Sequence, residues 1–421
     1  MKSFLAFAVI ALTGLAAGVA SCAYNDDGAA ADSYPAQPIA PGADDDEGDD
    51  APGLGRSPVS DPISVVPSSG LPSGLFLMDA NNNLDVVRHN TRVFLAFRTA
   101  PTHFASTDTR LHIVSSFDER HWDLETSFFY GRDLREPRLL SFNGRLFVYF
   151  ALLGKNPFDF EPQGMMVSEY LAPGVWSEPE LFYGQGFIPW RTKTIDGVPY
   201  MLAYIGGGAI YSLKPEPIRV HWLTTGDGRS WIPVVPGQAE VLSGGVSETD
   251  FVFLDDGSLR AVSRNEAGDE NGFGTKICRA DADDLGDWQC VDDPRKFDSP
   301  LLFRHGNDVY LIGRRNLTET GHYDLGRFDL PFPMRHLYYE LDYWFRKKRC
   351  SLWRMDTDTL DIDFVLDLPS RGDTCFPGLL DEGGGVYSVY NYTSALEGPD
   401  PVWLRGQIDP TFVYRVNLEL P

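Results

Sequence analysis

Two residues of opposite charge, Glu248 and Arg264, lie at equal distances in sequence from Asp256, in the stretch "SETDFVFLDDGSLRAVSRNE". If this stretch folds as an antiparallel hairpin, residues equidistant from its turn face each other. The pair then forms a cross-strand ion pair, or it forms part of a site in which the carboxylate handles protons and the guanidinium binds an acidic group. Both interpretations stay open, because one hairpin has the same geometry in each case.

The hairpin that would hold this pair is one copy of a repeat. Similar segments with a turn between two apolar runs occur at 84–98, 137–151, 191–205, 249–264, 300–315 and 377–392. A second hairpin, marked by tryptophan in most copies, follows all but the last. Four strands per unit, repeated, predict an all-β fold, a six-bladed β-propeller of four-stranded antiparallel blades over residues 71–421. Five blades with an extra hairpin, or a β-sandwich, are the alternatives.

The last repeat has too few strands, and the segment 74–79 ("GLFLMD") could supply the missing one and close the ring. In a propeller, residues just before the first strand or just after the second strand of each blade converge over the central channel. These positions hold Arg98, Arg135, Glu136, Trp190, Arg191, Glu248, Arg264, Asp298, Arg314, Asp373 and Tyr390. A rim of solvated turns would also be polar, but the repeated arginine favours a binding site.

Two of the tryptophan hairpins carry a recognisable motif. "TTGDGRSW" (224–231) and "SFDERHW" (116–122) resemble the Asp-box of sialidases and related propellers. The resemblance implies a sialidase-like glycoside hydrolase fold, in which Asp118, Asp227 and Trp231 belong to the scaffold. Their side chains would cap turn amides and pack between blades.

The resemblance also assigns roles to site residues. Glu248 matches the glutamate that activates a tyrosine nucleophile, and Arg264 matches one member of an arginine triad that grips a sugar carboxylate. The other two triad members would be Arg98 in "AFRTAP" and Arg349 in "RKKRCSLWRMD", with Arg346 close by. The acid/base aspartate would be Asp108 in "ASTDTRLHIVSS", with His103 as the alternative.

One element of the sialidase pattern is missing. Where that family has its nucleophile, this chain has "GDTCFPGLL" (372–380) without a tyrosine. Tyr390 or Tyr392 could substitute, although Asp373 is the better-placed reactive group. Two carboxylates among Asp108, Glu248 and Asp373 could act as general acid and base, and their separation would decide inversion or retention.

These positions predict a glycan ligand. Beside the three arginines, we expect Arg191, Trp190 and Tyr390 to contact it. The expected function is a glycoside hydrolase acting on acidic or decorated glycans, and the alternative is a non-catalytic carbohydrate-binding propeller. Within 314–349, Leu337, Leu341, Trp344 and Phe345 have helical spacing. Such a helix would form a lid over the site or pack against the propeller.

The N-terminus has the pattern of an exported lipoprotein. Residues 1–21 combine a lysine with an apolar run and end in "VAS" before Cys22, which predicts a signal peptide and lipidation of Cys22 by acyl chains. Residues 22–70 are rich in Ala, Gly, Pro and Asp and predict a flexible tether. We expect a monomer anchored to the cell envelope, at the outer membrane if the host is Gram-negative.

The charge and the cysteines exclude some classes of partner. A formal net charge of −24 argues against nucleic acid. Beyond Cys22, the four cysteines Cys278, Cys290, Cys350 and Cys375 predict two disulfides, with three connectivities possible. Sequence spacing favours the pairs Cys278 with Cys290 and Cys350 with Cys375. Their spacing predicts no metal site, and no cofactor is expected.

Overall fold

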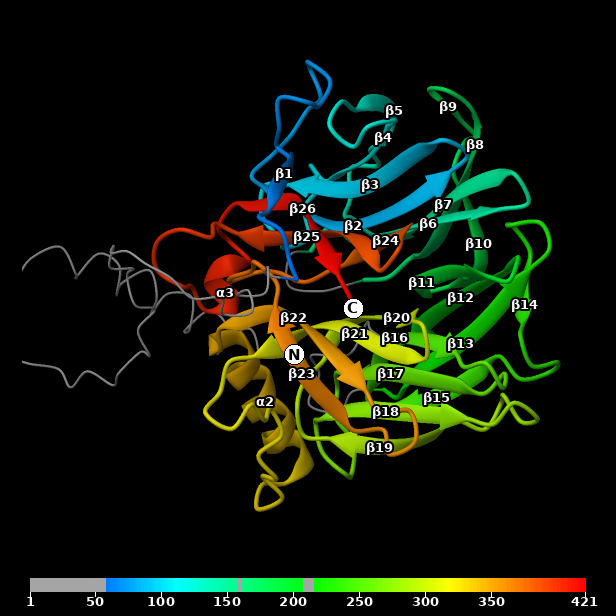
Figure 1. Cartoon of the computed structure of the whole chain (residues 1–421). Helices are drawn as coiled ribbons and strands as arrows, with labels where there is room; N and C mark the ends of the chain where they lie inside the picture. The colour runs from blue at the N-terminus through cyan, green and yellow to red at the C-terminus, as the bar shows by residue number, and fades with distance from the viewer. Residues whose placement is uncertain (1–57, 157–160, 207–215) are drawn as a thin grey trace, which may run out of the picture. The chain divides into compact units, whose positions relative to one another are not determined.

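The computed structural model describes residues 58–156, 161–206 and 216–421. They belong to one compact unit, Ser57–Pro421, and the prediction of an all-β fold is confirmed (Figure 1). The predictions for the signal peptide, for lipidation of Cys22 and for the tether up to residue 57 fall outside the described residues. No helix in the described part of the chain is long and apolar enough to cross a membrane.

The strands form six antiparallel sets in chain order, four with four strands and two with five. The first set contains β2 (Ala80–His89), β3 (Arg92–Ala100), β4 (Arg110–Ser116) and β5 (Asp123–Phe128). The second contains β6 (Leu134–Phe142), β7 (Arg145–Leu152) and β8 (Gly164–Ala172), with β9 (Val175–Trp176) and β10 (Glu180–Gln185) both paired to β8. The third contains β11 (Ile188–Ile195), β12 (Val198–Ile205) and β13 (Ile218–Thr225), with β14 (Trp231–Pro233) and β15 (Glu240–Gly244) both paired to β13.

Three further sets follow. The fourth contains β16 (Val246–Phe253), β17 (Leu259–Asn265), β18 (Thr275–Ala280) and β19 (Gln289–Asp293). The fifth contains β20 (Asp298–His305), β21 (Asp308–Asn316), β22 (Lys348–Met355) and β23 (Ile362–Asp367). The last contains β24 (Gly378–Gly383), β25 (Val386–Ser394), β26 (Thr411–Glu419) and the N-terminal β1 (Ile63–Val66). A parallel bridge between β2 and β26 joins the first and last sets in one sheet. These antiparallel sets are consistent with the predicted propeller.

The strand that completes the last set differs from the expected one. β1 pairs antiparallel with β26, which places the blue start of the described chain beside its red end (Figure 1). Residues 74–79 form no strand, so the prediction that this segment fills the position is wrong. The ordered unit also begins before residue 71, inside the range assigned to the tether. Val65 and Val66 are buried, so two short apolar residues are enough to hold this polar segment on the sheet.

The hairpin turns follow from local chemistry. In the turns between β6 and β7 and between β11 and β12, Asn143–Gly144 and Asp196–Gly197 all have positive φ, between 49° and 80°. Two consecutive residues with positive φ match the type I′ turn that suits the twist of paired strands, and Asn-Gly and Asp-Gly are its preferred sequences. The turn residues therefore fix the register of these two hairpins.

The core lies between successive sets, where each pair of neighbours buries a cluster of apolar side chains. The tryptophans of the second hairpins contribute to this packing as expected. Trp231 of the third set lies against Tyr149 of the second, with ring centroids 5.6 Å apart. Trp122 of the first set lies against Tyr390 of the last, at 6.4 Å. Each ring therefore joins its own set to the preceding one.

Two short polar turns carry the motif that resembles the Asp-box. Asp118 Oδ1 accepts hydrogen bonds from the backbone N–H groups of Arg120 and His121, at 2.9 and 2.8 Å. Asp227 Oδ1 does the same for Arg229 and Ser230, at 2.8 and 2.7 Å. Both aspartates therefore hold their turns, which is the scaffold role expected for them.

The predicted helix is present as α2 (Phe332–Phe345), between β21 and β22, and a short helix, α3 (Trp403–Gly406), precedes β26. The buried face of α2 differs from the predicted one. Leu341 and Phe345 are exposed, whereas Tyr339 and Tyr343 are buried. The rings of these tyrosines are packed in the interior, and each hydroxyl still forms a hydrogen bond: Tyr339 donates to Asp324 and Tyr343 to Asp298. Apolar spacing alone could not reveal this preference.

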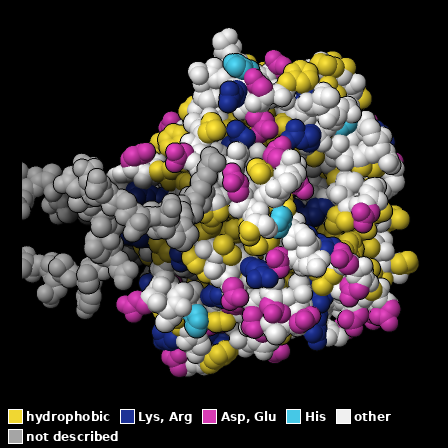
Figure 2. All heavy atoms as spheres, in the orientation of Figure 1, with side chains coloured by type: hydrophobic (Ala, Val, Ile, Leu, Met, Phe, Trp, Pro, Cys, Tyr) yellow, Lys and Arg dark blue, Asp and Glu magenta, His cyan; other side chains and the backbone are white. Residues whose placement is uncertain are grey.

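Both predicted disulfides are confirmed. Cys278 and Cys290 join β18 to β19, and Cys350 and Cys375 join β22 to the segment before β24. Acidic side chains are spread over the face shown in Figure 2, with Lys and Arg among them. On that face the acidic side chains are therefore not gathered in one patch.

Candidate active site

Irregularities in the first strands shape the candidate site. In five of the six sets, a β-bulge interrupts the first strand close to its start, after Asn82, Arg135, Pro189, Val246 and Asp298. A bulge adds an unpaired residue and re-aims its side chain, and bulges are common beside active sites. Glu136, Trp190, Glu248 and Ser299 lie within these bulges, and Glu136 and Ser299 have positive φ, at 53° and 51°. Strict alternation along a strand would not place these side chains correctly.

The charged pair Glu248 and Arg264 forms a direct ion pair, with Nη1 of the arginine 2.6 Å from Oε1 of the glutamate. The other glutamate oxygen, Oε2, accepts the backbone N–H of Ser299 at 2.6 Å. Arg264 also contacts Glu266 through Nη2 at 3.3 Å and Asp298 through Nε at 3.2 Å. Three carboxylates therefore surround one guanidinium, and each of its nitrogens faces one of them.

Helix α2 reaches this cluster through Tyr343. The Tyr343 hydroxyl donates to Oδ2 of Asp298 at 2.6 Å, and its ring lies 5.7 Å from the guanidinium carbon of Arg264. Burial raises the pKa of Tyr343 well above its ordinary value, so the hydroxyl stays protonated. Burial favours the neutral form of Asp298, but Arg264 and Lys296 outweigh it and lower the pKa of this carboxyl. Asp298 is therefore an ionised acceptor fixed by the helix.

Glu136 is one of the carboxyls in this region whose pKa burial raises; Glu266 and Glu340 are two others. Burial raises its pKa to about 7, and the nearby Glu248 adds to the effect, while Arg138 and Arg135 oppose it. Its Oε2 is buried without a hydrogen-bond partner, and the nearest guanidinium nitrogen, on Arg138, lies 4.0 Å away. Glu136 therefore keeps its proton up to about neutral pH, near a second carboxyl, Glu248, that is paired with Arg264.

His103 and Asp373 meet at the junction of the first and last sets, although they are 270 positions apart in sequence. Nδ1 of His103 lies 2.5 Å from Oδ2 of Asp373, and the hydroxyl of Tyr392 donates to Oδ1 of the same carboxylate at 2.8 Å. Asp373 is fully buried, whereas 12% of the His103 side chain is exposed. The histidine, and not the aspartate, is thus the member of this group that reaches solvent.

Arg98, which the sequence predicted to bind substrate, has its guanidinium group bonded entirely within the protein. It is fully buried, and its Nε and Nη2 donate to Oδ1 of Asp133 at 3.1 and 2.9 Å. Nη1 donates to Asn82 and to the carbonyl of Thr102, both at 3.3 Å, and Nη2 to the carbonyl of Phe104 at 3.0 Å. Every nitrogen of this guanidinium has a partner within the protein, which gives Arg98 a structural role.

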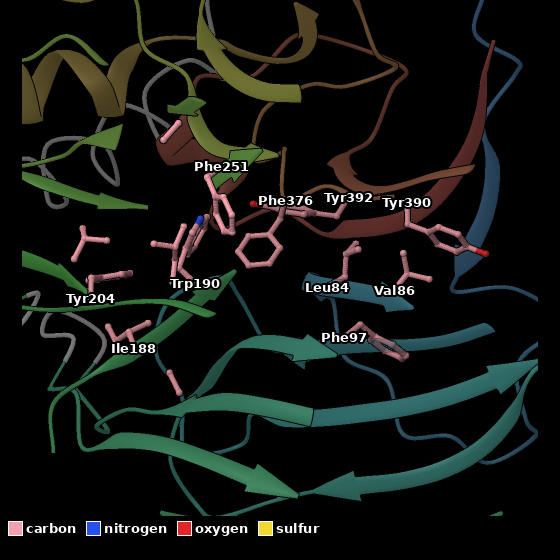
Figure 3. Close-up of a cluster of buried hydrophobic side chains, with 14 of the residues drawn as sticks. Leu84, Val86, Phe97, Ile188, Trp190, Tyr204, Phe251, Phe376, Tyr390 and Tyr392 are labelled. Atoms are coloured by element: carbon pink, nitrogen blue, oxygen red, sulfur yellow. The ribbon is translucent and has the colours of Figure 1, made fainter. Parts of the chain in front are cut away.

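Three other predicted contact residues are also buried in the scaffold. Trp190 packs edge-on to Phe376 at 5.2 Å, and the two rings lie together in Figure 3. Arg191 donates to the carbonyl of Pro300 at 2.8 Å, across to the fifth set. Tyr390 points away from the Trp190–Phe376 pair (Figure 3) and donates to Glu119 at 2.7 Å. Glu119 belongs to the turn before Trp122, so Tyr390 serves the junction between sets.

The remaining predicted residues form their hydrogen bonds and ion pairs with groups other than Glu248, Arg264 and Asp298. Arg349 forms a two-point pair with Asp400, at 3.1 and 2.8 Å, and Arg346 pairs with Asp342. Asp108 is exposed, and only its backbone N–H has a hydrogen-bond partner, the hydroxyl of Ser106. The structure thus shows no meeting of Arg349, Arg98 and Arg264 around a common acceptor.

Arg314 is one of the arginines with a donor to spare; Arg138, whose three guanidinium nitrogens are all buried without a hydrogen-bond partner, is another. Nη1 donates to the carbonyl of Thr374 at 3.0 Å, and Nε is buried without a partner. Asp298, Glu248, Tyr343 and Tyr392 are close enough to influence its charge. Arg314 and Glu136 both stood among the converging positions in the sequence, but nothing in residue type separated them from Arg98 or Arg191. Within residues 58–156, 161–206 and 216–421, no group of His, Cys, Asp or Glu side chains is placed to hold a metal ion.

No family model matches the chain, and no curated protein matches it. Among solved structures, it is similar to a protein of unknown function from Dyadobacter fermentans, at a TM-score of 0.55 and 16% identity over 81% of this chain and 95% of that one. It is also similar to Trypanosoma rangeli sialidase in complex with sialic acid, at a TM-score of 0.53 and 12% identity over 81% of this chain and 54% of that one.

A Hadza microbial sialidase gives a TM-score of 0.51 and 11% identity, over 81% of this chain and 66% of that one. At these identities the likeness establishes the fold alone, which is sialidase-like. The chain spans about half of the first sialidase and about two thirds of the second.

Proposed function

We propose that this chain is a glycoside hydrolase with a six-bladed sialidase-like propeller, in which each set is one blade and β1 completes the last. The observation that carries the proposal is the pair of neighbouring carboxyls, Glu136 and Glu248: Oε2 of Glu136 is buried without a hydrogen-bond partner, whereas Glu248 is paired with Arg264. Burial keeps a proton on Glu136 up to about pH 7, while Arg264 and the N–H of Ser299 stabilise charge on Glu248. Glycoside hydrolysis requires such a proton donor beside an ionised carboxylate.

The contacts of the arginines indicate which of them could hold a substituent of the substrate. A triad that grips a sugar carboxylate needs free donors, but Arg98 is saturated by Asp133 and its neighbours, and Arg349 is paired with Asp400. Arg314 has a buried Nε without a hydrogen-bond partner and lies close enough to Glu248 to interact with its charge. We therefore expect one arginine, Arg314, to hold an acidic or polar substituent of the glycan. The similar Trypanosoma rangeli sialidase binds sialic acid in its complex, and binding of this sugar by the present chain is part of the proposal.

The proposed location is the cell envelope. The pattern ending at Cys22 supports export and lipid attachment, and the Ala, Gly, Pro and Asp-rich residues that follow would act as a spacer between membrane and propeller. The glycan would then be an extracellular or envelope polymer. Retention of the expressed protein in the membrane fraction, and its release on Cys22→Ala, would test the anchor.

A panel of aryl glycosides that includes neutral sugars, sialosides and uronosides tests the activity. We expect release of the fluorophore from at least one member, and a fall of about 10²-fold in Glu248→Gln, the size of effect typical for a residue in acid–base catalysis. Glu240→Gln is the matched control, because Glu240 is an exposed glutamate on β15 and should leave the rate unchanged. Equal loss in both variants would contradict a role of Glu248 in the chemistry.

A second function, non-catalytic glycan binding, is favoured by one observation. The segment 372–380 lacks the tyrosine nucleophile, and the hydroxyl of Tyr392 is already bonded to Asp373. If no member of the panel is turned over but glycans bind by calorimetry, and Arg314→Gln weakens that binding, the protein is a binding module.

A further inference from the structure

We propose that His103, oriented by Asp373, is the catalytic base that activates water in this site, and that the reaction inverts the anomeric carbon. The inference rests on the proposed hydrolase function. It assigns removal of the water proton to a histidine of the first set, in place of Asp108 or Glu248, and replaces the tyrosine nucleophile with water. Glu248, paired with Arg264, then acts on the reacting centre through its charge and takes no proton itself.

His103 is held by three contacts from different parts of the chain. Its backbone N–H donates to the carbonyl of Gln407 at 2.9 Å, and its own carbonyl accepts from Nη2 of Arg135 at 2.5 Å. Nδ1 donates to Oδ2 of Asp373 at 2.5 Å. Nδ2 of Asn82 lies 3.3 Å from the same nitrogen, but both are donors in this tautomer and they form no hydrogen bond. With both sides of the backbone and one ring nitrogen fixed, the ring has a defined orientation.

Asp373 is itself fixed, which suits a positioning residue. Its N–H donates to Oγ of Ser394 at 3.1 Å, and its carbonyl accepts the N–H of Ser394 at 3.0 Å. A Cβ at Gly406 would lie 2.2 Å from the nitrogen of Asp373, so the short helix α3 packs directly on this segment. A buried carboxylate bonded to Nδ1 selects the tautomer that leaves Nε2 as the proton acceptor.

The arrangement also argues against a covalent route through Tyr392. Burial, followed by the nearby Asp373, raises the pKa of Tyr392 well above its ordinary value. Its hydroxyl donates its proton to Asp373 at 2.8 Å and is 99% buried. A neutral, buried phenol is a poor nucleophile, whereas His103 reaches solvent. Water is therefore the nucleophile that this group of residues can activate.

The imidazole has the protonation state that a base requires. Burial lowers the pKa of His103, Asp373 opposes this effect, and Arg135 and Arg98 add to it. These three charged side chains, with the neutral Asn82 and Tyr392, are the polar groups that face the ring. The imidazole is therefore neutral at pH 7. Arg135 links the base to the proposed acid, because it binds the carbonyl of His103 and precedes Glu136 in β6.

The proposed step is balanced. Nε2 of His103 takes a proton from water as the water oxygen bonds to the anomeric carbon. The glycosidic carbon–oxygen bond breaks, and the leaving oxygen receives the proton of Glu136. Proton exchange with solvent then restores the neutral imidazole and the protonated carboxyl. Because water attacks directly, the configuration of the released sugar is opposite to that of the substrate.

The test follows the anomeric configuration of the first product by proton NMR, using the full chain and the aryl glycoside that the panel identifies. We expect inversion, together with a fall of about 10²-fold in His103→Ala that added imidazole partly restores. His121→Ala is the matched control, because His121 also pairs with an aspartate, Asp118 at 2.7 Å, in an exposed turn. This control should keep full activity.

Asp373→Asn separates catalysis from folding. Loss of the carboxylate that favours the charged imidazole should lower kcat and move the acid limb of the pH–rate profile to lower pH, with KM little changed. Retention of configuration, or full activity in a folded His103→Ala variant, would overturn the assignment while leaving the hydrolase function intact. Absence of turnover on every glycoside would instead remove the hydrolase function, and the assignment with it.

Discussion

Asp133→Asn is expected to lower the free energy of unfolding by about 3–5 kcal/mol, because it leaves two buried guanidinium groups without their counter-ion. Asp133 is fully buried, and its Oδ1 accepts from Arg98 and from the hydroxyl of Thr109, the latter at 2.9 Å. Its Oδ2 accepts from Nε of Arg135 at 2.5 Å. An asparagine keeps the shape but removes the charge and turns one acceptor into a donor that faces an arginine.

Chemical denaturation of Asp133→Asn beside Asp123→Asn measures this effect. Asp123 also pairs with an arginine, Arg92, but 74% of its side chain is exposed, so its replacement should cost less than about 1 kcal/mol. Adding Arg98→Met to Asp133→Asn should recover part of the loss, since one uncompensated charge is removed. A loss in Asp133→Asn no larger than in Asp123→Asn would contradict the buried network.

The second large effect is a stabilisation that depends on pH. In the unfolded chain the carboxyl of Glu136 ionises near 4.5, but burial raises its pKa in the folded protein to about 7. Below pH 4.5 both states hold the proton and the residue has no effect. Between pH 4.5 and 7 the unfolded state loses its proton first, so this residue makes the folded state progressively less stable. Glu136→Gln removes that titration.

We therefore expect Glu136→Gln to match the wild type near pH 4 and to exceed its stability by about 3 kcal/mol above pH 7, from a shift of roughly 2.5 pH units at 1.36 kcal/mol each. Unfolding measured at several pH values checks this, with Glu178→Gln as the exposed control. The variant should also lose activity if Glu136 is the proton donor, a trade between stability and function. A difference that does not change with pH would refute the assigned acidity.

The hydrogen bonds and ion pairs of the charged residues explain why residue type was a poor guide to the candidate site. Arg98 and Arg264 occupy comparable positions at the ends of second strands, but one is enclosed by Asp133 and three backbone or amide oxygens, and the other faces three carboxylates. Glu136 and Glu248 are likewise both glutamates in bulges. Their burial and neighbours, not their identity, raise the pKa of one and pair the other with an arginine.

The sequence by itself determined the all-β class, the repeated hairpins and both disulfides, because each depends on local information. A pair such as Asn143–Gly144 sets its turn whatever surrounds it. Alternating apolar residues likewise mark a strand without knowledge of its partner. The even number of cysteines and their close spacing predicted bonds between neighbours, and the structure has those bonds.

Only the tertiary structure decided which strand completes the last set, which face of α2 is buried, and which charged groups meet. Those outcomes depend on contacts between distant parts of the chain, such as His103 with Asp373, and on single-residue bulges that reverse the direction of a side chain. Neither burial nor a bulge has a signature in residue order. The pKa of Glu136 and the orientation of His103 therefore could not be predicted until the chain was folded.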